Sequence, residues 1–315
     1  MTRVAVLVER HGDHVAGPTL EALTLARSLG EVVAVWLGGS PDSEAVAALG
    51  SYGASEVRVV APALRLPAAL AAALGAATAD ADVVLVDSTF VNKEIVTRLA
   101  LATGAGVVVD AAGASIVDGR VETLQTVFAA TWNVQTRIVA ERAIVGLRPN
   151  TTQAVAVSGA PVAAVVAVDF EPPTTREGVV HVEAVEASDG VPLAEAPVVV
   201  SGGRGTGGDY ALIREFAELL GGAVGASRDA TDEGWISHEH MVGQTGTTVT
   251  PALYVACGIS GAVHHRGGMQ ASGTIVAVNL DPDAPIFEIA DFGVVGSLFD
   301  VLPDAMARIR EVRGA

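Results

Sequence analysis

The sequence predicts an α/β protein in which an N-terminal, parallel-rich α/β domain precedes a C-terminal, doubly wound domain. Short, continuously apolar runs alternate with helical patterns in the first half, which is typical of parallel βαβ units. An acidic stretch with Pro and Gly follows at 181–197, and the alternation then starts again. We expect a first domain over 1–184, a linker over 185–196 and a second domain over 197–315.

The first domain is expected to begin with four parallel strands and four helices. Apolar runs predict the strands, at 4–9, 32–38, 56–61 and 83–88. Helical patterns follow each of them, at 18–29, 43–53, 67–79 and 92–106. In the last helix, the spacing predicts that four residues face inward: Ile95, Val96, Leu99 and Ala102.

The remainder of the first domain is predicted to be strand-rich. Asp118-Gly119 lies between two strand-like runs and indicates a hairpin. Further apolar runs occur within 133–168. We therefore expect the parallel sheet to be continued by antiparallel strands.

The second domain repeats the βα order. Apolar runs predict strands at 198–201, 253–258 and 274–279. The segment 210–221 predicts a helix with one apolar side, formed by Leu212, Ile213, Phe216, Leu219 and Leu220. Helical segments are expected from about Val294 to Val312, with a bend at Pro303.

Composition limits the function classes. The formal net charge of −17 argues against a nucleic-acid partner and disfavours anionic lipid. The single cysteine, Cys257, stands in an apolar run and is expected to be a core residue rather than a catalytic thiol. The opening residues do not read as a leader, and the run 67–79 is too short to span a bilayer, so we expect a cytoplasmic protein.

Two Gly-rich turns in the second domain predict a phosphate-bearing ligand. The run 203–208 matches GxGxxG between a strand and a helix, as in a Rossmann-like dinucleotide fold. Gly258, Ser260 and Gly261 form a second turn before a helix, suited to pyrophosphate. One alternative is an NAD(P)-binding oxidoreductase or transhydrogenase-like domain with Asp229 on the ribose; another is a turn without a ligand.

Histidine pairs invite a metal interpretation, which we reject. His238 and His240 have HxH spacing, and His264 and His265 are adjacent. Neither pair is joined by cysteine or by a further carboxylate cluster, as a closed site would require. We expect no metal ion.

The second domain resembles a known family. GGRG, GASR, VGQTG, YVACGISGA, HHRGGM, TIVAVN, DPDAPIFEIADFGVV and LFDVLP occur in one fixed order. This string closely resembles the FAD domain of the electron-transfer flavoprotein alpha subunit over nearly all of 197–303. The first domain is similar to the same family through VAVLVE and KEIVTRLALATGAGVVVD.

The resemblance implies roles around an FAD molecule. Arg228 would lie over the flavin ring, Thr245 would bond the N5 region with Gln244 beside it, and His265 would lie near the carbonyl O2. Ser260 would lie near the flavin–phosphate segment, Arg204 near the cofactor, and Asn279 and Asp291 at the adenosine end. The full predicted set is Arg204, Ser227, Arg228, Gln244, Thr245, Gly258, Ser260, Gly261, His265, Asn279 and Asp291.

The residue types agree with this chemistry, although each has a simpler interpretation. Reduction of a flavin places negative charge on its N1–C2=O2 edge, where a fixed cation and a hydrogen-bond donor are stabilising. Alternatively, Arg228 is a surface salt-bridge partner, Thr245 caps a turn and His265 is a core histidine. The ordered set favours the cofactor interpretation.

Three departures from the family pattern concern phosphate-end charge and the partner surface. Members often carry lysine where this chain has Leu280, and QTGK where Thr247 stands here. The first turn, GGRGTGGDY, also lacks the usual lysine or Ser-Gly-Glu-Asn run. FAD binding itself remains the expectation.

The resemblance implies an electron carrier without a substrate of its own. The chain would pair with a smaller beta subunit that binds AMP. FAD would take electrons from flavin dehydrogenases of the acyl-CoA type, as in fatty acid beta-oxidation, and pass them to a respiratory acceptor such as a membrane quinone reductase. The C-terminal domain would need to swivel between donor and acceptor. A binding module with purely structural FAD is a further alternative.

Overall fold

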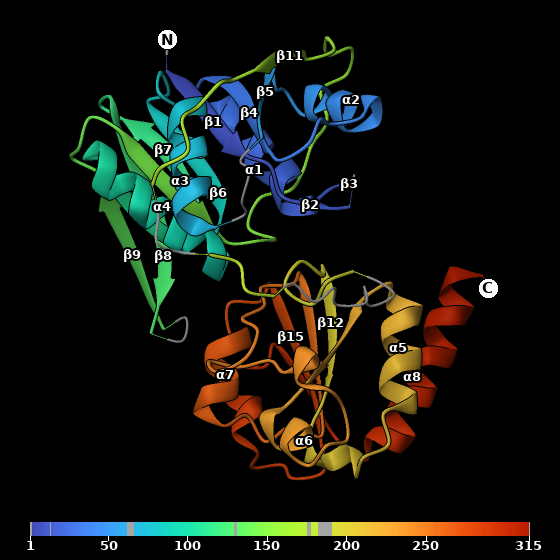
Figure 1. The fold of residues 1–315 in the computed structure, drawn as a ribbon. Coiled ribbons are helices and arrows are strands. Elements are labelled where there is room, and N and C mark those ends of the chain that lie inside the picture. Colours follow the sequence, from blue (N-terminus) through green and yellow to red (C-terminus); the bar gives the residue numbers. More distant parts are fainter. Residues whose placement is uncertain are drawn as a thin grey trace. The chain divides into compact units, whose positions relative to one another are not determined.

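The computed structural model describes residues 2–12, 14–61, 66–128, 131–174, 178–181 and 191–314. The chain forms two compact units, one from Met1–Thr126 and Asn133–Glu186 and the other from Val127–Trp132 and Ala187–Ala315 (Figure 1). The predicted linker over 185–196 lies partly outside the described residues, so its limits stay a prediction.

The first unit is built on one nine-stranded sheet in the order β11-β5-β4-β1-β6-β10-β7-β8-β9. Its strands are β1 (Arg3–Leu7), β4 (Glu31–Leu37), β5 (Glu56–Val60), β6 (Val83–Asp87), β7 (Gly106–Val117), β8 (Arg120–Val127), β9 (Trp132–Arg137), β10 (Ala143–Leu147) and β11 (Ala164–Ala167). A separate two-stranded ribbon joins β2 (Arg10–His11) to β3 (His14–Val15).

Helices cover both faces of this sheet. They are α1 (Gly17–Leu29), α2 (Ser43–Ser51), α3 (Pro67–Ala77) and α4 (Phe90–Thr103). Leu23 of α1 and Leu49 of α2 pack in one apolar cluster with Val4 and Val6 of β1. Leu74 of α3 and Leu99 of α4 pack in a second cluster with residues of the opposite pleat, such as Ala5 and Leu7. The central strands β1, β4, β6 and β10 are therefore buried on both sides, as their continuously apolar sequences predict, whereas the edge strands β9 and β11 are mostly exposed.

The hairpin prediction is confirmed. Val117 pairs with Arg120 in antiparallel β7 and β8. The two residues between them, Asp118 and Gly119, have φ of 49° and 74°, which is the backbone of a type I′ turn.

The expectation that antiparallel strands continue the parallel sheet is confirmed for β8, which pairs with β7. It is wrong for two strands in 133–168, because β10 runs parallel between β6 and β7, and β11 runs parallel to β5 at the sheet edge. One inward-facing residue expected in α4 is also wrong. Ala102 is exposed, because the last turn of α4 carries no buried residue. The buried residues of α4 include Ile95, Val96 and Leu99, as predicted.

The second unit is a five-stranded, fully parallel sheet in the order β13-β12-β14-β15-β16. Its strands are β12 (Val198–Gly202), β13 (Ala223–Ala226), β14 (Leu253–Cys257), β15 (Thr274–Asn279) and β16 (Phe292–Val295). The first strand, β12, has the second on one side and the third on the other. The order therefore reverses between β12 and β14, and ligands bind at the carboxyl ends of strands at such a point.

Helices and short 3₁₀ turns complete the second unit. They are η1 (Arg204–Thr206), α5 (Ala211–Leu220), α6 (Arg228–Asp232), η2 (His238–His240), α7 (Val263–Met269), η3 (Pro285–Glu288) and α8 (Leu298–Arg313). Figure 1 shows α5 and α8 together on one face of the sheet and α7 on the other. Ile213 and Leu302 pack in the apolar cluster of the first face, and Met269 and Ile286 in that of the second.

The C-terminal helix begins later than expected. Val294 and Val295 belong to β16, which pairs with β15 and completes the sheet edge. Ser297 then caps α8, and Pro303 lies inside it. No described helix is long and apolar enough to cross a membrane.

Candidate functional site

A pocket of about 710 Å³ lies at the carboxyl edge of the second sheet. Its lining follows the ends of β12, β13, β14 and β15, where the strand order reverses. Eight predicted residues line it: Arg204, Ser227, Arg228, Thr245, Gly258, Ser260, His265 and Asn279. The motifs that follow different strands thus meet at one cavity. Its volume lies in the range typical of ligand-binding pockets.

The two Gly-rich turns contact each other. Gly205 donates its backbone N–H to the carbonyl of Gly258 at 3.0 Å. A Cβ on Gly205 would lie 2.6 Å from the Cα of Gly258, and one on Gly203 would lie 2.5 Å from the carbonyl oxygen of Gly258. Glycine is therefore required here for the approach of the two turns, in addition to the approach of any ligand.

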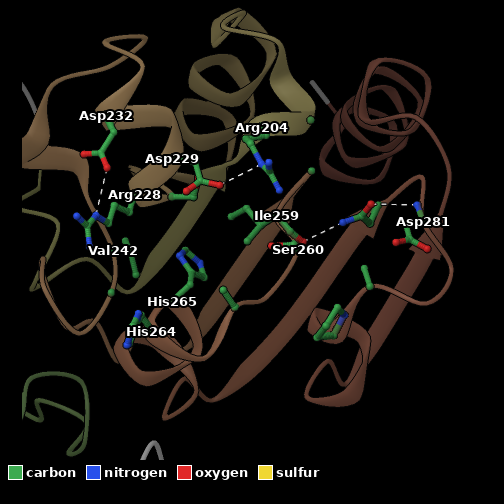
Figure 2. Close-up of a pocket in the computed structure, with 18 of the residues that line it drawn as sticks. Arg204, Arg228, Asp229, Asp232, Val242, Ile259, Ser260, His264, His265 and Asp281 are labelled. Atoms are coloured by element: carbon green, nitrogen blue, oxygen red, sulfur yellow. Dashed lines mark hydrogen bonds and ion pairs between the residues drawn. The ribbon is translucent and has the colours of Figure 1, made fainter.

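Helix α6 brings Arg228, Asp229 and Asp232 to the pocket, where each aspartate forms an ion pair with an arginine (Figure 2). Ser227 caps this helix by accepting the N–H of Ala230. Arg228 lies 3.2 Å from the Asp232 carboxylate, and Arg204 of the first turn lies 3.0 Å from the Asp229 carboxylate. Both arginines are more than half exposed, at 62% and 69%, so water weakens the pairs and leaves the guanidinium groups accessible.

His265 occupies the floor of the pocket, where it is 7% exposed. Its Nε2 lies 2.9 Å from the hydroxyl of Tyr254, a fully buried residue of β14. Its Nδ1 makes no hydrogen bond within the described residues. Burial is the main cause that lowers the pKa of His265 to about 4, so the imidazole is neutral at pH 7.

The loop between β13 and β14 is held against α7. The backbone N–H of Gln244 donates to the carbonyl of His264 at 2.8 Å. A Cβ on Gly268 would lie 2.4 Å from the Cα of Gly243, so these backbones touch. Thr245 lines the pocket, whereas the exposed Gln244 does not.

The far end of the pocket is organised by Asn279 at the end of β15. Its side-chain N–H donates to the carbonyl of Ile259 at 2.9 Å, and its oxygen accepts the N–H of Asp281 at 3.0 Å. Gly261 has φ of 84°, and its Cβ would lie 2.4 Å from the nitrogen of Ile286. Gly261 thus shapes the second turn but does not line the pocket.

Asp291 is not part of this pocket, which corrects its placement at the adenosine end. Its carboxylate accepts the N–H of Ile275 at 2.8 Å, near the start of β15. The pocket lies at the other end of that strand, beside Asn279. Asp291 precedes β16 in a parallel pair, so its side chain joins the amino edge of the sheet.

Several lining residues were not predicted as ligand contacts. They are Gly205, Asp229, Asp232, Val242, Gly243, Ile259, Ala262, His264, Asp281, Ala284 and Pro285. The i, i+4 spacing of Arg228 and Asp232 could have indicated one of them, because such residues face each other on a helix. Asp229, considered for an NAD ribose, pairs with Arg204 instead.

Cys257 is a core residue, as expected. It is fully buried in the apolar cluster under α5 and α8, and burial raises the pKa of its thiol to about 12. A thiol in that state is a poor nucleophile. His238 and His240 lie in η2, and the described residues contain no group of three His, Cys, Asp or Glu able to hold a metal ion.

Comparisons with known proteins identify the family. The model of the electron transfer flavoprotein FAD-binding domain matches residues 192–270, and that of the electron transfer flavoprotein domain matches residues 4–173. The chain belongs to the electron transfer flavoprotein alpha subunit family. It is 39% identical to "Electron transfer flavoprotein subunit alpha" of Mycobacterium leprae over all of both chains. The protein of that name from Bacillus subtilis is 34% identical, over 96% of this chain and 95% of its own.

Membership makes the chain part of an electron carrier rather than a substrate-converting enzyme. The match to the FAD-binding domain lies within the unit that contains the pocket. The residues present fit this cofactor. The lining combines two Gly-rich turns, which leave room for a ligand close to the backbone, with two arginines and a buried imidazole nitrogen that makes no hydrogen bond within the described residues.

Proposed function

We propose that this pocket holds FAD noncovalently, with the flavin ring near Arg228, Thr245 and His265. The pyrophosphate would lie on the turns at Gly205 and Ser260, and the adenosine near Asn279. The observation that carries the proposal is the convergence of these residues on one cavity where the strand order reverses. When bound, FAD supplies reversible uptake of electrons.

The side chains of this chain would control that uptake electrostatically. Arg228 places a permanent positive charge beside the ring, and an arginine can also stack on a planar system. His265 is neutral and buried, so it can form a hydrogen bond with the flavin without adding a charge to the pocket. Thr245 supplies a hydroxyl that can donate or accept a hydrogen bond. Backbone N–H groups of the turns would bind the phosphates, because the lining carries three carboxylates but only two arginines and so has no excess of positive side chains.

We further propose a heterodimer with a smaller beta subunit that binds AMP, contacted by the N-terminal domain over 1–184. The domain over 197–315 would swivel beyond a linker at 185–196, so that the cofactor meets donor and acceptor in turn. Donors would be flavin dehydrogenases of the acyl-CoA type, and the acceptor a membrane quinone reductase or similar respiratory protein. We propose that the complex acts in the cytoplasm.

One experiment tests the central proposal. The chain is produced together with the product of its genomic neighbour, and the absorption spectrum of the purified complex is recorded before and after addition of an acyl-CoA dehydrogenase and its substrate. We expect a flavin spectrum that bleaches as electrons arrive. A folded complex that is colourless and takes up no added FAD would contradict the proposal.

A further inference from the structure

We infer that Tyr254 is a positioning residue whose hydroxyl donates a hydrogen bond to Nε2 of His265. This bond fixes the neutral imidazole as the tautomer with hydrogen on Nδ1, so that Nδ1–H is presented to an acceptor atom of the ligand. The inference rests on the proposed binding of FAD. It concerns a residue that does not line the pocket and acts only through its neighbour.

The burial of Tyr254 determines the direction of the hydrogen bond. The side chain is 0% exposed, so its hydroxyl hydrogen requires a protein acceptor. Nε2 of His265 lies 2.9 Å from the hydroxyl oxygen. Ser201 also lies near, but its Oγ makes no hydrogen bond within the described residues. Donation to Nε2 is thus the arrangement that satisfies the hydroxyl.

The other nitrogen of the ring then becomes the functional atom. A neutral imidazole has one protonated nitrogen, so acceptance at Nε2 places the hydrogen on Nδ1. Burial keeps the ring neutral by lowering the pKa of His265 to about 4. Nδ1 is buried and makes no hydrogen bond within the described residues, although the backbone of Val242 lies near enough to raise the pKa of the ring. Figure 2 shows the ring extending from α7 into the pocket. A buried donor without a partner is an unsatisfied polar group that a ligand acceptor would relieve.

The surrounding residues hold the imidazole ring in one position. Its tautomer therefore determines whether Nδ1 presents a hydrogen-bond donor or an acceptor to the pocket. The rings of Tyr254 and His265 meet edge to face, with centroids 6.1 Å apart and planes at 61°. Gly268 of α7 contacts the backbone of Gly243, and this contact holds the helix against the loop between β13 and β14. Without the hydroxyl of Tyr254, both tautomers would fit the same position, and only one of them presents a donor.

The test is Tyr254→Phe, which preserves the shape of the buried ring. The full chain, produced with its companion subunit, is labelled with ¹⁵N-histidine, and His265→Asn assigns the resonance. In the FAD-free wild type we expect Nε2 to appear as unprotonated and Nδ1 as protonated. In Tyr254→Phe we expect a mixture of tautomers and FAD binding weakened roughly 5–10-fold. In a His265→Ala background, Tyr254→Phe should change FAD binding by less than about twofold.

Tyr210→Phe is the matched control. Tyr210 is also buried in this unit, but its hydroxyl donates to the carbonyl of Gly202 at 2.8 Å, whereas it is Tyr254 that bonds to His265. Its removal should leave the ¹⁵N pattern of His265 unchanged. The inference is overturned if wild-type His265 carries hydrogen on Nε2, or if Tyr254→Phe preserves both the pattern and the FAD affinity. A wild type that binds no FAD refutes the proposed function instead, and the ¹⁵N pattern still decides the role of Tyr254.

Discussion

Arg228 and Asp232 form an ion pair, 3.2 Å apart, at the end of the pocket where we propose that the flavin ring binds. Replacement of Arg228 by Ala removes a positive charge and also leaves the carboxylate of Asp232 without its partner in this pair. Both changes disfavour electrons on a nearby ring. We expect the reduction potential of bound FAD to fall by roughly 20–40 mV, equivalent to about 1–2 kcal/mol over two electrons.

Asp232→Asn provides the matched control for that change, because it removes the opposite charge from the same pair. Its potential should move upward, and Arg228→Lys should stay close to wild type. Potentials are measured by spectroscopic titration against reference dyes. If Arg228→Ala and Asp232→Asn shift the potential in the same direction, or not at all, the electrostatic role of the pair is wrong.

His265 makes the stability of the protein depend on pH. Its pKa is about 4 in the folded state and about 6.5 when unfolded, so between these values the unfolded chain binds a proton that the folded chain does not. The contribution of His265 is therefore complete above pH 6.5 and declines toward pH 4. At pH 5 the expected loss is about 2 kcal/mol in the free energy of unfolding.

Urea unfolding of the FAD-free protein at pH 7 and pH 5 measures this loss, with His265→Asn as the control. The variant lacks the titrating ring, so the difference between wild type and variant should move by about 2 kcal/mol, to the disadvantage of the wild type at pH 5. Equal pH dependence in the two proteins would exclude His265 as the cause.

At the scale of elements, the decisive contact is between the turns that follow β12 and β14. We expect Gly205→Ala to separate them, because the new Cβ would lie 2.6 Å from the Cα of Gly258. Overpacking of this kind costs about 1–3 kcal/mol, so FAD affinity should fall roughly tenfold or more. Gly207→Asn changes the same turn where no atom lies within 4 Å of the added Cβ, and Asn tolerates its φ of 58°. Fluorescence titration with FAD compares the two, and similar affinities would contradict the importance of the contact.

The sequence predicted elements better than it predicted their neighbours. Apolar runs and the Asp118-Gly119 turn are local signals, and the structure confirms them. The pairing of β11 with β5 joins residues more than a hundred positions apart, which no local pattern records. The prediction for Asp291 was wrong for a related reason. A motif gives the position of a residue along the chain but not the edge of the sheet at which its side chain lies.

The site was predictable to the extent that it follows strand ends. Ser227, Gly258 and Asn279 stand directly after or at the ends of parallel strands, and these ends meet at one edge. Tyr254 lies within β14, and no sequence pattern connects it with the pocket. Only the distance to His265 reveals its connection with the pocket.

At the scale of the whole molecule, the two units have separate apolar cores, and every residue that lines the pocket belongs to the second unit. A ligand stabilises the cooperative unit that binds it, by about 2.7 kcal/mol at a free concentration one hundred times its Kd. FAD should therefore raise the temperature at which residues 191–314 unfold and leave the unfolding temperature of the first unit unchanged. Limited proteolysis during heating, read by mass spectrometry, assigns each transition to its peptides. NAD⁺ at the same concentration is the control and should move neither transition. An equal shift of both transitions with FAD would mean that the units unfold as one cooperative body, in which the pocket stabilises the entire chain.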